Sequence, residues 1–122
     1  MQHNKAFLAI VQQARADINE LSTQDVEDML AGDEDFLLID VREDGEWAQG
    51  HLPKATHLSK GIIERDIETK VKDKASKIVV YCGGGYRSAL AAVNLQKMGY
   101  KNVYSMWGGF RHWREEGRNI IG

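Results

Sequence analysis

Apolar residues along the chain follow two spacings, one typical of amphipathic helices and one typical of strands. Recurrence every three or four positions predicts helices over about residues 4–16, 23–31, 62–71 and 88–98. Nearly continuous apolar runs predict strands over residues 36–41, 77–81 and 103–106. Shorter extended pieces are expected around residue 18 and over residues 55–58.

Small polar residues and glycines mark the ends of these elements. Ser22 can cap a helix whose third residue is Asp25, and Gly32 stops that helix. Gly99 is well placed to end the alanine-rich helix in a left-handed conformation. These signals fix the borders of the two helices better than the apolar spacing does.

The predicted strands and helices alternate, which indicates an α/β domain with a mainly parallel sheet covered on both faces. Residues 42–53 form a loop with one helical turn, and a last short helix around Trp113 ends near Gly117. Sheets of this kind bind ligands beyond the carboxyl ends of their strands. Cys82 directly follows the strand 77–81 and therefore marks the expected site.

Length and charge narrow the classes of function. A chain of 122 residues with 43% hydrophobic content fits one domain, which we place at residues 18–122 after an N-terminal helical extension, residues 1–17. Sixteen basic and eighteen acidic residues leave a net charge of −2, which gives no global attraction for nucleic acid or an anionic membrane. Without a membrane-length apolar stretch or a secretory signal pattern, we expect a soluble cytoplasmic protein.

Cysteine and histidine usage restricts the metal chemistry. Cys82 is the only cysteine, which excludes an internal disulfide or a multi-cysteine metal site and fits a reducing compartment. The histidines show no ligand spacing on a common helix; they are His3, His51, His57 and His112. We therefore expect neither a metal nor a cofactor.

The segment from Cys82 to Ser88 carries the strongest chemical signal. Three glycines, Gly83 to Gly85, separate a buried strand from a helix start, so we expect unusual dihedrals that turn successive N–H groups toward one atom. These donors, the helix dipole and the Arg87 guanidinium would stabilise a thiolate on Cys82, which is the reactive form. The same donors would stabilise a persulfide and hold an oxyanion substrate.

A simpler interpretation of this segment has to be weighed against a reactive thiolate. Cys82 could be a small buried apolar residue, with the glycines forming only a tight strand-to-helix turn. A phosphate-binding P-loop is excluded, because the glycine-lysine-serine/threonine ending is absent. The arginine at a helix start directly after the glycines favours the reactive cysteine.

Three blocks of sequence carry a family resemblance. The first is Leu38-Ile39-Asp40-Val41-Arg42-Glu43 with Glu46-Trp47, Gly50-His51-Leu52-Pro53 and Ala55. The second is the loop from Cys82 to Arg87, and the third contains Gly99-Tyr100, Asn102-Val103, Gly108-Gly109 and Trp113. In this order and spacing the blocks resemble the rhodanese-like domains, specifically the small single-domain bacterial type, over about residues 18–117.

The resemblance implies a three-layer α/β/α fold and a sulfurtransferase whose sulfur-accepting nucleophile is Cys82. It implies that loop amides surround this sulfur, and the expected binding residues are Gly83, Gly84, Gly85, Tyr86, Arg87 and Ser88. The loop spans six residues from cysteine to arginine. Loops of the related dual-specificity phosphatases are one residue longer, so sulfur is a better match than phosphate or arsenate.

Several positions depart from the family pattern. Gly83 stands where many thiosulfate-using relatives have a basic residue, which predicts weak thiosulfate activity. Lys54 stands where the family often has glycine. Trp107 stands before the paired glycines, where it either lines the pocket mouth or packs against the domain.

Polar residues of the first block are expected to support the site. Asp40, Glu46 and His51 are interpreted as an ion-pair and hydrogen-bond network that fixes the neighbouring loops. Arg42 follows the carboxyl end of a strand and is the member of this group expected to reach a bound anion.

We expect Cys82 to take a sulfane sulfur from thiosulfate or a persulfide and to pass it to cyanide or a thiol, with ping-pong kinetics. The partners are then small sulfur donors and thiol acceptors, or an acceptor protein, with no nucleic acid and no membrane. The alternative is a binding, sulfur-carrier or redox-sensing module of the same fold. Monomer and homodimer both stay open, since the N-terminal helix could cover its own domain or a neighbour's.

Overall fold

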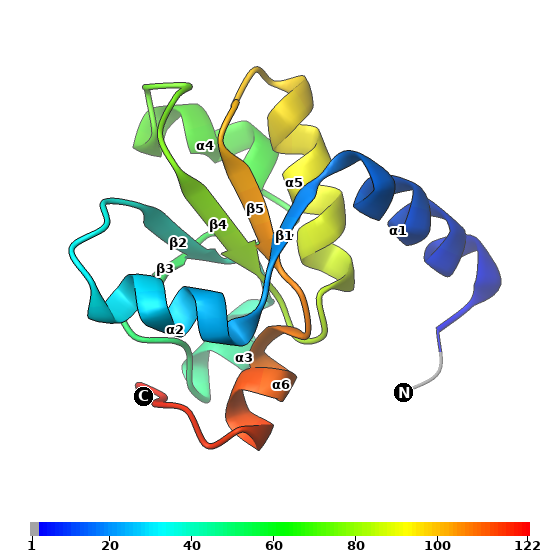
Figure 1. Ribbon diagram of the computed structural model, residues 1–122. Coiled ribbons are helices and arrows are strands. Elements are labelled where there is room, and N and C mark those ends of the chain that lie inside the picture. Colours follow the sequence, from blue (N-terminus) through cyan, green and yellow to red (C-terminus); the bar gives the residue numbers. More distant parts are fainter. Residues whose placement is uncertain (1–2) are drawn as a thin grey trace.

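The computed structural model describes residues 3–122, and within them six helices surround one five-stranded sheet (Figure 1). All strand pairs are parallel, and the strand order is β1-β5-β4-β2-β3. The strands are β1 (Asn19–Leu21), β2 (Leu37–Asp40), β3 (Thr56–His57), β4 (Ile78–Tyr81) and β5 (Val103–Met106). The predicted parallel α/β fold is confirmed.

Helices cover both faces of this sheet, as an all-parallel sheet requires. They are α1 (Lys5–Asp17), α2 (Thr23–Ala31), α3 (Asp44–Ala48), α4 (Ile63–Lys70), α5 (Tyr86–Lys97) and α6 (Gly109–Glu115). The extended piece expected near residue 18 is the edge strand β1, which pairs with β5. The loop 42–53 contains α3 as its helical turn.

The two faces of the sheet bury separate apolar clusters. Side chains alternate along a strand, so Val80 packs with the α4 and α5 residues on one face while Val79 packs with α2 and α6 on the other. On the first face Ile67 of α4 is fully buried, and on the second Trp113 of α6 is 1% exposed. The central strand β4 is therefore held from both sides, which fixes the residue that follows it.

Helix borders agree with the capping signals where those are chemically specific. Ser22 and Asp25 form a reciprocal capping box, with Asp25 N–H donating to Ser22 Oγ at 3.0 Å and Ser22 N–H donating to Asp25 Oδ2 at 2.9 Å. α5 begins at Tyr86, two residues before the predicted start at Ser88. The earlier start follows from Gly85, whose positive φ ends the loop there.

Helix α1 packs against its own chain. Val11 and Ala14 of α1 are buried against Ala89 of α5, and Figure 1 shows the two helices side by side. The division into an extension and a domain at residue 18 stays a prediction. None of the helices formed by residues 3–122 is long and apolar enough to cross a membrane.

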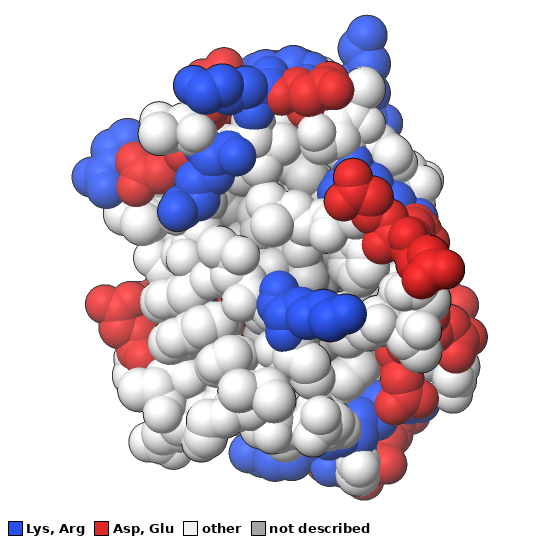
Figure 2. All heavy atoms as spheres, turned by 90° about the vertical axis from the view of Figure 1, so that its left-hand side faces the viewer, with Lys and Arg blue, Asp and Glu red and all other residues white. Residues whose placement is uncertain are grey.

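The charged side chains show no dominance of one sign over the face in Figure 2. Acidic and basic residues lie mixed around its margin, and its centre is mostly uncharged. The acidic run 33–35 is exposed, as expected of a solvated loop. Lys77 forms an ion pair with Glu34, so the loop before β2 also contacts the residue that precedes β4.

Candidate active site

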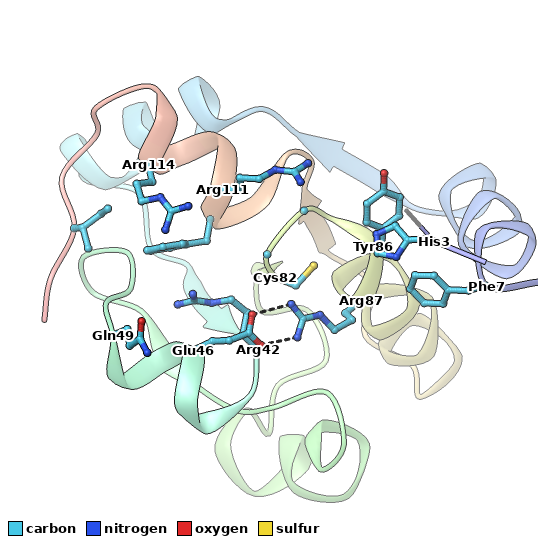
Figure 3. Close-up of a pocket in the computed structure, with 14 residues that line it drawn as sticks. His3, Phe7, Arg42, Glu46, Gln49, Cys82, Tyr86, Arg87, Arg111 and Arg114 are labelled. Atoms are coloured by element: carbon cyan, nitrogen blue, oxygen red, sulfur yellow. Dashed lines mark hydrogen bonds and ion pairs between the residues drawn. The ribbon is translucent and has the colours of Figure 1, made fainter. Parts of the chain in front are cut away.

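Cys82 lies immediately after β4, at the edge of the sheet where the parallel strands end. The residue is 1% exposed, yet it lines a cavity of about 790 Å³ that opens above this edge. Figure 3 shows its sulfur at the centre of the lining side chains. Position beyond the carboxyl end of a central strand is typical of ligand sites in such sheets.

Backbone donors converge on the Cys82 sulfur. The N–H groups of Gly85 and Ser88 donate to Sγ at 3.1 and 3.4 Å, and the Ser88 hydroxyl lies 3.6 Å from it. Ser88 Oγ is itself 2.8 Å from Ser105 Oγ of β5. Of the loop residues expected to surround the sulfur, Gly83 to Ser88, two donate a backbone N–H to it within residues 3–122, namely Gly85 and Ser88.

The glycine loop curls at one residue. Gly85 has φ +103°, whereas Gly83 and Gly84 are not among the positive-φ residues of the described chain, so the left-handed backbone in this stretch is confined to Gly85. A Cβ on Gly85 would stand 2.7 Å from the Trp107 ring. Gly85 therefore combines a left-handed backbone with a close contact, and both require glycine.

Helix α6 supports the loop from outside. The N–H groups of Phe110 and Arg111 donate to the carbonyls of Cys82 and Gly83 at 2.8 and 2.9 Å. A Cβ on Gly109, at φ +60°, would stand 2.4 Å from the Cys82 carbonyl oxygen. The outward carbonyls of the loop are thus satisfied by α6, which leaves its inward amides available to the sulfur.

Arg87 does not face the pocket as an unpaired cation. Its guanidinium donates to both carboxylate oxygens of Glu46, at 2.7 and 3.1 Å, and this pair joins α5 to α3. The hydrogen bond from Arg87, ahead of other effects, lowers the pKa of Glu46. The bond to Glu46 in turn raises the pKa of Arg87 above its usual value, and the Cys82 charge adds to this.

Arg42 is held by Asp40 in a buried ion pair. The guanidinium bonds both Asp40 oxygens, with the shortest distance 2.7 Å, and donates to the Gly50 carbonyl at 2.7 Å. It also lies over the Phe110 ring, 4.1 Å from the centroid. Burial lowers the pKa of Arg42, but the bond and charge of Asp40 outweigh it, so the pKa is raised. Arg42 lines the pocket while neutralised, which weakens its predicted role as an anion ligand.

The remaining first-block residues pack beside the site. The His51 ring stacks on Trp47, with centroids 3.6 Å apart, and its Nδ1 lies 2.9 Å from the Leu52 carbonyl. Buried Tyr81 accepts the Leu52 N–H at 3.1 Å, and burial followed by the Asp40 charge raises the pKa of the Tyr81 hydroxyl. His51 is thus part of a packed loop and is not among the residues that line the cavity.

Trp107 is also outside the cavity lining. Its ring lies under the Arg15 guanidinium of α1, 3.4 Å from the centroid, and meets Tyr86 edge-on at 5.6 Å. Of the two roles considered for Trp107, this geometry favours packing. The ring joins α1, the Cys82 loop and the end of β5.

Several lining residues escaped the sequence reasoning. They are His3, Phe7, Gln49, Arg111, Arg114 and Ile120. The spacing of Arg111 and Arg114 after the paired glycines was a usable signal, since positions three apart share a helix face. Within residues 3–122, no cluster of three or more His, Cys, Asp or Glu side chains is placed to hold a metal.

Comparison with known proteins gives consistent matches. Residues 22–116 match the family described as the rhodanese-like domain. A putative sulfurtransferase of Bacillus subtilis is 39% identical over 100 residues, covering 82% of this chain and 94% of the relative. A sulfurtransferase of Allochromatium vinosum is 35% identical over 104 residues, covering 85% and 95% respectively.

Solved structures resemble the fold over most of its length. A Rhodopseudomonas palustris protein of unknown function, described as a possible tyrosine phosphatase, has a TM-score of 0.86 and 31% identity, covering 99% of this chain and 98% of that one. A rhodanese-like domain protein of Staphylococcus aureus has a TM-score of 0.75 and 27% identity, covering 86% and 100%.

Proposed function

This chain belongs to the rhodanese-like domain family, and on that premise we propose that it transfers sulfane sulfur through a persulfide on Cys82. Similar proteins are named as sulfurtransferases, which supports a transferase of this general kind. The donor is thiosulfate or a persulfide, and the acceptor is cyanide, a small thiol or an acceptor protein. The single thiol favours a reducing compartment such as the cytoplasm for this reaction.

The observation that carries the proposal is the pair of N–H groups, from Gly85 and Ser88, directed at the Cys82 sulfur. Preorganised donors in a water-poor site stabilise negative charge without reorganising during the reaction. They favour a thiolate before sulfur is taken up and an anionic persulfide afterwards. A cysteine that merely filled space would not need two backbone donors.

The transfer proceeds in two displacements. The Cys82 thiolate attacks the outer sulfur of thiosulfate, forming an S–S bond while the S–S bond of thiosulfate breaks, and sulfite leaves with the electron pair. Cyanide or a thiolate then attacks the terminal sulfur of the persulfide, and the Cys82 thiolate is regenerated as the leaving group. Charge balances in each step, so no external oxidant or reductant is required.

Sulfur transfer fits the loop better than phosphate transfer does. Four residues separate Cys82 from Arg87, and Arg87 is engaged by Glu46. A phosphatase needs its loop arginine for the equatorial oxygens of the phosphoryl group. We therefore expect no phosphatase activity, despite the likeness to the structure described as a possible tyrosine phosphatase.

A sulfur-carrier role is the second candidate. A Bacillus subtilis relative named as a putative sulfur carrier protein is 30% identical over 96 residues, although these cover only 51% of that protein. A carrier would load sulfur on the same cysteine and release it only to a partner protein. The two roles differ in turnover with small acceptors, and both begin with a persulfide.

The test is intact mass spectrometry of the protein after treatment with thiosulfate, and separately with a persulfide donor. We expect a gain of about 32 Da, removed by cyanide with release of thiocyanate. The Cys82→Ser variant should gain nothing, because serine provides no thiolate, and its similar size should preserve the fold. A gain that persists in this variant, or no gain from any donor in the wild type, contradicts the persulfide mechanism.

A further inference from the structure

The cavity above Cys82 is larger than inorganic sulfur compounds require. Its volume of about 790 Å³ lies within the range of about 300–1,000 Å³ typical of organic ligand sites. Cyanide or thiosulfate would leave most of that space to water. A cavity of this size around a sulfur-transferring cysteine suits an organic molecule that brings its own sulfur atom.

Two arginines of α6 give one wall of the cavity a net positive charge. Arg111 and Arg114 are exposed and stand three positions apart, on one face of the helix. Nη2 of Arg111 lies 3.8 Å from where a Cβ on Gly84 would be, which places this guanidinium beside the Cys82 loop (Figure 3). Within residues 3–122 neither arginine forms an ion pair, whereas the two other arginines of the cavity are paired with carboxylates.

A second part of the cavity lining is aromatic and comes from the N-terminal segment and α5. The His3 ring lies 5.2 Å from Phe7 and 4.6 Å from Tyr86, measured between centroids, and Phe7 lies 6.2 Å from Tyr86. Figure 3 shows these three side chains grouped together, with Arg111 nearer to them than Arg114. The Tyr86 ring and Nη2 of Arg111 lie 3.3 and 3.8 Å from the same point, a Cβ built on Gly84, so the cluster adjoins Arg111. Residues 3 and 7 precede the segment that matches the family, 22–116, so two of the three rings come from the N-terminal extension and the third from α5.

We propose that the sulfur acceptor of this site is an organic thiol that carries a carboxylate and an apolar body. The inference rests on the proposed sulfur transfer and names its substrate class. Arg111 and Arg114 bind the carboxylate through charge-assisted hydrogen bonds, for which guanidinium geometry is suited. The apolar body lies against the aromatic cluster, and the thiol reaches the persulfide on Cys82.

The chemical step is a displacement at sulfur. The acceptor thiolate forms a bond to the terminal sulfur of the Cys82 persulfide, and the S–S bond to Cys82 breaks. The Cys82 thiolate leaves with the electron pair, and the acceptor departs as its own persulfide. The acceptor thiolate and the Cys82 persulfide anion become the acceptor persulfide anion and the Cys82 thiolate. The total charge is unchanged, so the step needs no further reactant.

The experiment compares two thiols that differ chiefly in the carboxylate. Protein loaded with sulfur at Cys82 is mixed in single turnover with para-(mercaptomethyl)benzoate or with its methyl ester. The wild type should transfer sulfur to the carboxylate about tenfold faster, as expected for charge-assisted hydrogen bonds. Arg111→Gln with Arg114→Gln should lower this ratio to about one, and the Arg→Lys pair should restore part of it.

A matched control removes the same charge elsewhere. Lys72 and Lys97 are exposed and outside the cavity, so the Lys72→Gln, Lys97→Gln protein should keep the tenfold ratio. A ratio of about one in the wild type, or one that survives the arginine changes, overturns the inference. The inference is also overturned if the wild type transfers sulfur to cyanide but to neither thiol, the result expected if the acceptor is a protein. Failure to load sulfur at all would refute the proposed function instead.

Discussion

Glu46 sets the charge that an anionic sulfur donor meets at the Cys82 loop. Its carboxylate accepts two hydrogen bonds from Arg87, and Asp40 likewise pairs with Arg42, so each of these two cavity arginines has a carboxylate counter-charge. Thiosulfate is a dianion, and such pairing weakens its attraction to the site. The weak thiosulfate activity predicted from Gly83 thus gains a second physical reason.

Changing Glu46→Gln should increase the second-order rate of Cys82 loading by thiosulfate about three- to tenfold, because Arg87 loses its counter-charge. Glutamine keeps an oxygen to accept the Glu43 N–H, which Glu46 Oε1 now accepts at 3.0 Å. Stopped-flow mixing followed by mass analysis measures the rate. Asp33→Asn, an equal charge change at an exposed distant site, is the control, and an equal increase there would mean that only net charge matters.

The lowered pKa of Glu46 determines how the difference in thiosulfate loading rate between Glu46→Gln and the wild type depends on pH. A carboxyl whose pKa falls on folding stays ionised above its ordinary value of 4.5, and its contribution is lost only as the pH drops below that value. The ion pair is therefore intact throughout the neutral range. The advantage of Glu46→Gln should persist from about pH 8 to about pH 5 and shrink at high salt.

Lys54 carries backbone strain that the sequence had only marked as unusual. Its φ is +64°, the left-handed region, and it is the one non-glycine residue with positive φ in the described chain. The preference of the family for glycine at this position now has a conformational reason. A side chain with a Cβ costs free energy here that glycine does not.

Lys54→Gly should raise the free energy of unfolding by about 1 kcal/mol, the left-handed penalty less the added entropy of glycine in the unfolded chain. Urea denaturation measures the change. Lys54→Ala removes the same exposed side chain but keeps the Cβ, so it should give little or no gain. Equal stabilisation by alanine and glycine would assign the effect to the lysine side chain.

Among the elements, α1 is the one whose contribution to stability the family match does not address. It lies before the segment that matches the family and yet packs on α5. Val11 is 2% exposed and its neighbour Ile10 is 51% exposed. Val11→Ala should lower the free energy of unfolding by about 2 kcal/mol through lost apolar contact, while Ile10→Ala should change it by less than about 0.5 kcal/mol. Similar small effects at both positions, measured by urea unfolding, would mean that α1 is not docked on this domain.

Elements with chemically specific borders were predictable from the sequence, and those without were not. Ser22 with Asp25 fixed the start of α2, because a capping box has its own hydrogen bonds. The start of α5 was missed by two residues, since it depends on the Gly85 backbone and not on an apolar pattern. Apolar spacing locates an element, while its first residue is set by local hydrogen bonds and dihedrals.

At the scale of the whole molecule, the alternation of predicted strands and helices was enough to predict the parallel sheet. The predicted strand before Cys82 was enough to place that residue at the edge of the sheet. The rest of the cavity did not, because Phe7, Arg111 and Ile120 meet there from opposite ends of the chain. Neither the pairing of Arg87 with Glu46 nor the lack of an ion pair at Arg111 and Arg114 within residues 3–122 could be read from one sequence. Such pairings depend on how separate loops approach in space.

The contact between Trp107 and Gly85 has a consequence for observing the protein at work. The indole lies against Gly85, whose N–H donates to the Cys82 sulfur, and the Arg15 guanidinium lies over the same ring. Any shift of the loop on sulfur loading would therefore change the surroundings of this indole. The fluorescence of Trp107 would then report whether Cys82 carries a persulfide sulfur, with no added label.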